Sequence, residues 1–125
     1  MTVLPDTTLC AIVRDEKMNP AGGIEKFLAS HVPHVEQAVI ADTGSVDGTR
    51  EILEEAKAKY TNLRVVDIPF SGYGKTRNAA LKRVKTKFAL VLDADELLTH
   101  QVPKNDWAIL HSVMRENPSR KVFVF

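Results

Sequence analysis

The sequence has a single cysteine, no long apolar run and almost no net charge, and each of these absences excludes a class of protein. Cys10 has no partner for an internal disulfide, and because it lies in an apolar stretch we expect a buried structural thiol. No apolar run approaches the roughly 18 residues that a membrane span requires. The N-terminus also lacks the apolar core of a signal peptide, so we expect a cytoplasmic protein.

Charge and histidine spacing argue against two kinds of partner. A net charge of +1 predicts no binding to nucleic acid and no general attraction to anionic membranes. The histidines form no zinc pattern with the cysteine, and we expect them to be ordinary surface or helix-end residues. They are His31, His34, His100 and His111. A length of 125 residues predicts one domain, 1–125.

Apolar runs alternate with segments of helical periodicity along the chain. The runs predict strands at residues 8–13, 38–41, 63–68, 88–92 and 121–125. The periodic segments predict helices at 20–31, 49–60 and 76–85 and another after Pro103. Asn19 would cap the first helix, with Pro20 as its first residue. This alternation predicts the α/β class, a Rossmann-like three-layer α/β/α fold with a mainly parallel sheet and 63–68 at its edge.

Acidic residues follow three of the predicted strands. In a parallel sheet the carboxyl ends of the strands meet at one edge, where open α/β sheets bind their ligands. Helix capping would explain each acid alone but not their common placement. Paired carboxylates repel one another unless a cation such as Mg²⁺ or Mn²⁺ lies between them. The acids are Asp15 and Glu16, then Asp42, then Asp93 and Asp95.

A basic segment precedes the strand that carries the acidic pair. Gly74-Lys75-Thr76 suggests a P-loop, but the position where a P-loop needs its first glycine is Pro69, which excludes that interpretation. We expect Arg77 to lie near a helix N-terminus beside the acidic edge, where its guanidinium would favour a phosphate.

Four segments, in this order, resemble the family 2 glycosyltransferases of the GT-A fold. They are 9–16, ending in Asp-Glu; 40–49, containing Asp-Thr-Gly-Ser; 72–81, carrying Arg-Asn; and 92–98, containing the DxD motif. The Asp-Thr-Gly-Ser variant, together with the Gly-aromatic-Gly loop, is most similar to the lipopolysaccharide-core β-glucosyltransferase type.

The resemblance implies a role for each matching position in binding a nucleotide-diphosphate sugar, commonly a UDP-hexose. Val13 and Arg14 would line the base, Glu16 would lie near the ribose, Asp42 would hydrogen-bond the nucleobase, Arg77 would contact the base or the diphosphate, Asp93 would face the ribose or the sugar, and Asp95, with Asp93 beside it, would hold Mn²⁺ or Mg²⁺. Many relatives have tyrosine where Arg14 stands.

The resemblance also implies an inverting transferase of which this chain is the donor-binding half. The family's domain continues beyond this length with an acceptor-binding half that supplies the general base, so no catalytic residue is expected in this chain. The acceptor is not predicted, and peripheral membrane association and a homodimer through Val122–Phe125 are further options. Two alternatives stay open: a non-catalytic nucleotide-sugar binding module, and another Mg²⁺-dependent nucleotidyl or phosphoryl transferase.

Overall fold

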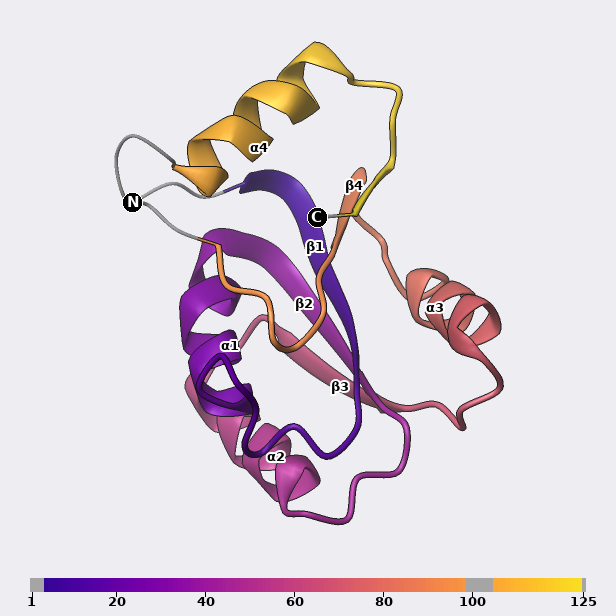
Figure 1. Cartoon of the computed structure of the whole chain (residues 1–125). Helices are drawn as coiled ribbons and strands as arrows, with labels where there is room; N and C mark the ends of the chain where they lie inside the picture. The colour runs from indigo at the N-terminus through magenta and orange to yellow at the C-terminus, as the bar shows by residue number, and fades with distance from the viewer. Residues whose placement is uncertain (1–3, 99–104, 125) are drawn as a thin grey trace.

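A computed structural model describes residues 4–98 and 105–124, and it contains one five-stranded sheet (Figure 1). All the neighbouring strands pair in parallel, in the order β3-β2-β1-β4-β5. The predicted parallel sheet, with its third strand at an edge, is therefore confirmed. The strands are β1 (Leu4–Val13), β2 (Val35–Asp42), β3 (Leu63–Asp67), β4 (Phe88–Val91) and β5 (Val122–Val124).

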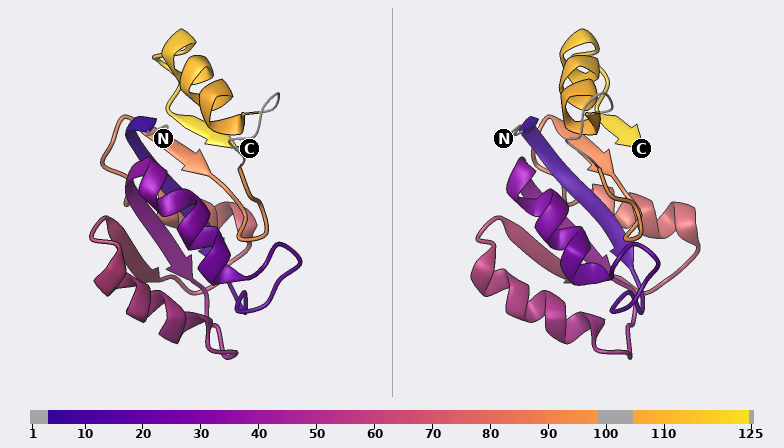
Figure 2. Two further views of the ribbon diagram at one scale, coloured as in Figure 1. Left: turned by 90° about the vertical axis from the view of Figure 1, so that its left-hand side faces the viewer. Right: turned by 60° about the vertical axis from the view of Figure 1, so that its left-hand side comes forward.

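Helices cover both faces of the sheet unequally. Figure 2 shows α1 and α2 on one side and α3 on the other, with α4 towards one end. A short 3₁₀ turn, η1 (Val32–His34), follows α1. The expected three layers are confirmed. The helices are α1 (Ile24–His31), α2 (Thr49–Lys59), α3 (Tyr73–Leu81) and α4 (Asp106–Glu116), and among the described residues none is long and apolar enough to cross a membrane.

The central strand β1 is buried on both of its faces. Leu9 and Ala11 belong to the core beneath α1 and α2, whereas Cys10, between them, belongs to the core beneath α3. Successive residues of a strand point to opposite faces, so burial of both faces requires a continuous apolar run. Cys10 is 1 % exposed, which confirms the expected buried thiol, and burial raises its pKa to about 11.

The first helix starts later than predicted. Instead of capping a helix that begins at Pro20, Asn19 accepts hydrogen bonds through Oδ1 from the amides of Ala21 and Gly23, both at 2.9 Å. The helix then begins at Ile24. Gly23 has φ +91°, and a Cβ there would lie 2.3 Å from the Lys17 carbonyl oxygen, so only glycine fits this position.

The third helix starts earlier than predicted. The helix α3 begins at Tyr73, three residues before the expected Thr76, and ends at Leu81. Thr76 is fully buried, and its hydroxyl accepts a hydrogen bond from the Ser71 amide at 3.1 Å, which fixes the preceding turn. Arg77 consequently lies inside the helix rather than at its N-terminus.

Two of the histidines expected at the surface or at helix ends lie at helix ends, His31 at the end of α1 and His34 at the end of η1, and both are buried. His31 is 0 % exposed and His34 is 7 % exposed. The Leu98 amide donates to His31 Nε2 at 3.1 Å, so the proton lies on Nδ1, which donates to the Phe27 carbonyl at 2.7 Å. Burial lowers the pKa of His31 to about 4, so the ring is neutral. His34 stacks on Trp107, and His100 lies outside the described residues.

Candidate functional site

The carboxyl ends of the strands form the rim of one cleft. Val13 of β1 pairs with Asp42 of β2, and Asp42 pairs with Asp67 of β3, so these three strands end at the same level. The loops that follow enclose a cleft of about 410 Å³. Its lining residues are Ile12, Val13, Arg14, Glu16, Thr43, Phe70, Tyr73, Asp93, Ala94 and Asp95.

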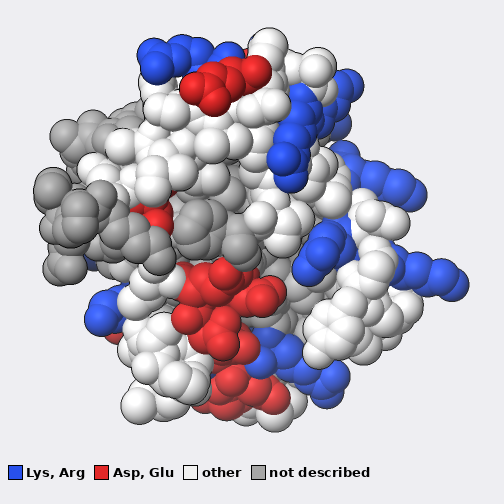
Figure 3. All heavy atoms as spheres, turned by 45° about the horizontal axis from the view of Figure 1, so that its top comes forward, with Lys and Arg blue, Asp and Glu red and all other residues white. Residues whose placement is uncertain are grey.

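Five of the seven predicted site residues line this cleft. They come from the end of β1 and from the loops after β1 and β4, two strands that are adjacent in the sheet but far apart in the sequence. Figure 3 shows acidic side chains gathered in one region of the molecular surface, with basic side chains close beside them. The five residues are Val13, Arg14, Glu16, Asp93 and Asp95.

Hydrogen bonds join the loop after β1 to the loop after β2. The Asp15 amide donates to Ser45 Oγ at 2.9 Å, and the Asp15 carboxylate accepts from the Val46 amide at 2.7 Å. The Glu16 amide donates to Thr49 Oγ1 at 2.8 Å. Asp15 has a φ of 53° and is not among the cleft-lining residues. Its carboxylate therefore stabilises the loops at the rim of the cleft and does not line the cleft itself.

Asn19 extends this network to the loop after β4. Its Nδ2 donates both to Glu16 Oε2 at 3.0 Å and to the Ala94 carbonyl at 3.1 Å. Ala94 lies between the two aspartates of the DxD segment. A single amide therefore sets the spacing between the β1 and β4 sides of the cleft.

Asp42 is buried, accepts hydrogen bonds from the turn that follows it, and is not among the residues that line the cleft. It is 4 % exposed, and its Oδ1 accepts from the Gly44 amide at 3.2 Å, the Ser45 amide at 3.0 Å and the Ser45 hydroxyl at 2.7 Å. Its Oδ2 lies 3.8 Å from Arg50 Nη1. The next residue, Thr43, lines the cleft instead. Contact between Asp42 and a nucleobase stays a prediction.

The loop after β4 has three carboxylates, of which two are exposed in the cleft and the third is hydrogen-bonded within the loop. Asp93 and Asp95 are both exposed and both line the cleft. Glu96 accepts from the Asp93 amide at 2.8 Å, while its own amide donates to the Asp93 carbonyl at 3.0 Å. The Glu96 carboxylate thus closes the turn that carries the other two.

The donor set suits a cation that shares its coordination with a ligand. Within residues 4–98 and 105–124, no group of three His, Cys, Asp or Glu side chains is arranged to hold a metal ion. Mg²⁺ and Mn²⁺ commonly take one or two carboxylates and complete their coordination with substrate phosphates and water. Asp93 and Asp95 fit that pattern, whereas a closed all-protein metal cage would need more donors.

Arg77 is not among the residues that line the cleft. It is partly buried in the second turn of α3, and its positive charge partly offsets the effect of burial on the pKa of Cys10. The prediction that Arg77 lies at a helix N-terminus is wrong, because α3 begins at Tyr73. Its contact with a nucleotide stays a prediction.

Sequence reasoning missed two aromatic residues of the cleft. Phe70 is 46 % exposed and Tyr73 is 77 % exposed, and their rings meet edge-to-face with centroids 5.2 Å apart. Both follow β3, and site residues were expected only at or just after the ends of other strands and at Arg77. The available signal was an aromatic residue between Gly72 and Gly74, in a loop leading to a helix.

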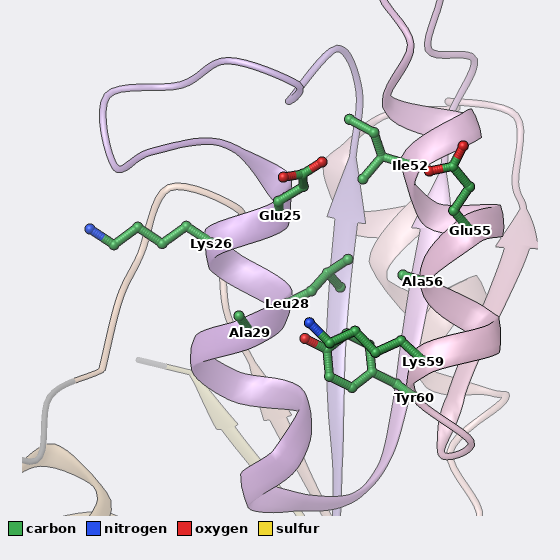
Figure 4. Close-up of a pocket in the computed structure, with 9 residues that line it drawn as sticks. All are labelled: Glu25, Lys26, Leu28, Ala29, Ile52, Glu55, Ala56, Lys59 and Tyr60. Carbon is green, nitrogen blue, oxygen red and sulfur yellow. The ribbon is translucent and has the colours of Figure 1, made fainter.

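A larger cavity, of about 500 Å³, lies elsewhere, between α1 and α2 (Figure 4). Its apolar lining includes Leu28, Ile52, Ala56 and Tyr60, and its charged residues are Glu25, Lys26, Glu55 and Lys59. No predicted site residue belongs to it. Two acids and two bases balance there, so nothing favours a ligand of one charge.

The comparison with protein families decides what kind of domain this is. Residues 23–115 match the family model described as Glycosyl transferase family 2. The chain belongs to glycosyl transferase family 2. The predicted family is therefore confirmed, whereas the lipopolysaccharide-core type within it is not.

Curated relatives of this family 2 chain are much longer proteins. A TPR repeat-containing protein of Synechococcus elongatus is 37 % identical over 95 residues, which are 76 % of this chain and 22 % of that protein. The poly(ribitol-phosphate) beta-N-acetylglucosaminyltransferase TarS of Staphylococcus aureus is 33 % identical over 76 residues, 59 % of this chain and 13 % of TarS. The chain thus spans less than a quarter of these relatives.

Solved structures share the fold of this family 2 chain. S. aureus TarS in complex with UDP superposes with a TM-score of 0.67 at 23 % identity, covering 90 % of this chain and 32 % of that one. The mannosyltransferase PcManGT from Pyrobaculum calidifontis, in complex with GDP-Man and Mn²⁺, gives a TM-score of 0.62 at 23 % identity, covering 78 % and 29 %. The GT-A type of α/β fold is confirmed by these matches.

Proposed function

We propose that this family 2 domain binds a nucleotide-diphosphate sugar, a UDP-hexose, as the donor-binding part of an inverting hexosyltransferase. The observation that carries the proposal is the exposed pair Asp93 and Asp95 in a cleft at the carboxyl ends of parallel strands. Ligands of open α/β sheets bind at this edge. Two exposed carboxylates would themselves repel a diphosphate, so such a ligand requires a cation between them.

Asp93 and Asp95 would hold Mn²⁺ or Mg²⁺ against the diphosphate. When bound, the cation would neutralise charge on the departing nucleoside diphosphate as the glycosidic bond breaks. Arg14, on the same cleft, supplies a fixed positive charge that would favour the same phosphates or stack on the base. Glu16, whose carboxylate accepts a hydrogen bond from Asn19, would also accept a ribose hydroxyl.

The relatives support the choice of ligand and cation. TarS was crystallised with UDP, and PcManGT with GDP-Man and Mn²⁺. We therefore choose UDP and Mn²⁺ as the first probes for this domain. Within the family we propose the lipopolysaccharide-core β-glucosyltransferase type, on the Asp-Thr-Gly-Ser and Gly-aromatic-Gly segments alone.

The general base of the transfer would come from outside the described cleft. Glu96 is the nearest further acid, and its carboxylate already accepts the Asp93 amide at 2.8 Å. A base must reach the acceptor hydroxyl, which a carboxylate engaged in its own turn does not do. The same observation favours a second candidate function, a non-catalytic module that binds the nucleotide sugar without transferring it.

Calorimetric titration with UDP, GDP and ATP, each with Mn²⁺ and with a chelator, tests the proposal. We expect UDP to bind only with Mn²⁺ and more tightly than ATP. Tighter binding of ATP than of UDP, or binding of UDP that is equally tight with chelator and with Mn²⁺, would contradict both candidate functions. Release of hexose from a UDP-hexose by the protein, alone or with acceptor, would then distinguish the transferase from the binding module.

A further inference from the structure

Phe70 and Tyr73 form an exposed aromatic wall on one side of the cleft. They are 46 % and 77 % exposed and lie edge-to-face, 5.2 Å between ring centroids. A tyrosine that is mostly exposed contributes little to the core, so packing does not account for its place. Aromatic rings at the edge of a cleft offer flat apolar surface to a planar ligand.

The wall is held in place by a buried hydroxyl. Thr76 is 0 % exposed, and its Oγ1 accepts from the Ser71 amide at 3.1 Å while its own amide donates to the Gly72 carbonyl at 3.0 Å. Gly72 has φ +96°, a conformation that L side chains rarely adopt, and it turns the chain into α3. Both rings therefore project from a fixed turn, so binding of a ligand would cost little conformational entropy in this segment.

The wall and the acidic pair reach the cleft from the loops after two different strands. Phe70 and Tyr73 follow β3, whereas Asp93 and Asp95 follow β4. The helix α3 begins at Tyr73 and packs against β1 and β2, so it brings the wall back over the middle of the sheet. All four residues therefore line one cleft. A cleft with these two kinds of side chain suits a ligand that is anionic at one end and carries a planar ring at the other.

We propose that Phe70 and Tyr73 are the stacking platform for the nucleobase of the donor. The inference rests on the proposed function, which places the diphosphate at Asp93 and Asp95. The nucleoside extends from one side of the diphosphate and the hexose from the other. With the nucleoside directed towards the start of α3, its base reaches the aromatic wall, and the hexose lies away from it. Base stacking on an aromatic ring depends on the π-face and tolerates different bases.

Three variants measured with two ligands test the platform. We expect Tyr73→Leu and Phe70→Leu each to weaken UDP binding in Mn²⁺ by about tenfold, whereas Tyr73→Phe keeps wild-type affinity. Binding of Mn²⁺ with pyrophosphate, which has no base, should be unchanged in all three. Ile109→Ala, which truncates another half-exposed apolar side chain on α4, is the matched control and should leave both affinities unchanged.

An NMR measurement identifies the group that stacks. The H5 and H6 signals of uracil should move upfield when UDP binds the wild type, and this ring-current shift should shrink in Tyr73→Leu. Unchanged UDP affinity in both leucine variants would overturn the platform. So would equal losses for UDP and pyrophosphate, or a loss confined to the UDP-hexose. Failure of the wild type to bind UDP with Mn²⁺ would instead defeat the proposed function itself.

Discussion

The two cavities differ less in volume than in the number of separate segments, and the kinds of side chain, that line them. The groove between α1 and α2 is the larger, at about 500 Å³, yet two neighbouring helices and Tyr60, the residue after α2, supply its lining, and its charges balance (Figure 4). The cleft at the strand ends, about 410 Å³, receives side chains from the loops after all of β1 to β4. Convergence of chemically different groups from separate strands marks a site better than volume does.

Loss of one acid from each cavity should give the largest contrast. We expect Asp95→Asn to abolish Mn²⁺-dependent binding of UDP, because it removes one of the two exposed carboxylates available to the cation. Glu55→Gln removes one carboxylate from the groove and should leave UDP binding unchanged. Calorimetry on both variants makes the comparison. Normal Mn²⁺-dependent binding by Asp95→Asn would show that the cleft is not the metal site.

Protonation of the buried His31 should destabilise the fold as pH falls. The pKa of His31 is about 4 in the fold against 6.5 for an unperturbed ring, chiefly because of burial. Between these values the unfolded chain binds a proton that the native state does not, so acidification lowers the free energy of unfolding. The shift corresponds to about 3 kcal/mol, present above about pH 6.5 and lost by about pH 4.

Urea denaturation at about pH 7 and about pH 4 measures this contribution. His31→Gln cannot titrate, so its free energy of unfolding should fall by about 3 kcal/mol less over that range than that of the wild type. An equal fall in His31→Gln and wild type would contradict the role of the buried neutral ring.

Removal of the amide that joins the two sides of the cleft should have a moderate effect. Asn19→Ala loses the hydrogen bonds to Glu16 and the Ala94 carbonyl, as well as those that turn the chain before α1. We expect the free energy of unfolding to fall by about 1–2 kcal/mol and UDP to bind several-fold more weakly. Ser119→Ala, at an exposed turn after α4, is the control and should change stability by less than about 0.5 kcal/mol.

The smallest effect is expected from the rim of the helical groove. Lys59→Ala removes an exposed charge beside Tyr60 and should change neither UDP affinity nor stability by more than about 0.5 kcal/mol. Calorimetry and thermal denaturation check both quantities. A tenfold loss of UDP affinity in this variant would show that the two cavities are coupled and would end the distinction drawn between them.

Local pattern alone was enough to predict most of the elements, and it failed where a side chain competes with the backbone. Continuous apolar runs predicted the strands, because both faces of β1 are buried. The predicted starts of α1 and α3 were wrong. The Asn19 side chain binds the Gly23 amide, and α1 starts only after Gly23. The Thr76 hydroxyl binds the Ser71 amide, and α3 starts before Thr76. The hydrogen bond from the Leu98 amide to His31 could not be predicted either, since the two residues are 67 positions apart in the sequence.

The sequence by itself determined the α/β class, the family and the presence of acids at one edge, because strand periodicity, alternation with helices and short motifs are local properties of the chain. Only the tertiary structure decided which of those groups share a cleft. Thr43 lines the cleft where Asp42 was expected, Arg77 lies inside α3 and outside the lining, and two aromatic rings from the segment after β3 join the acids. These outcomes depend on hydrogen bonds and packing between segments far apart along the chain, which no local pattern records.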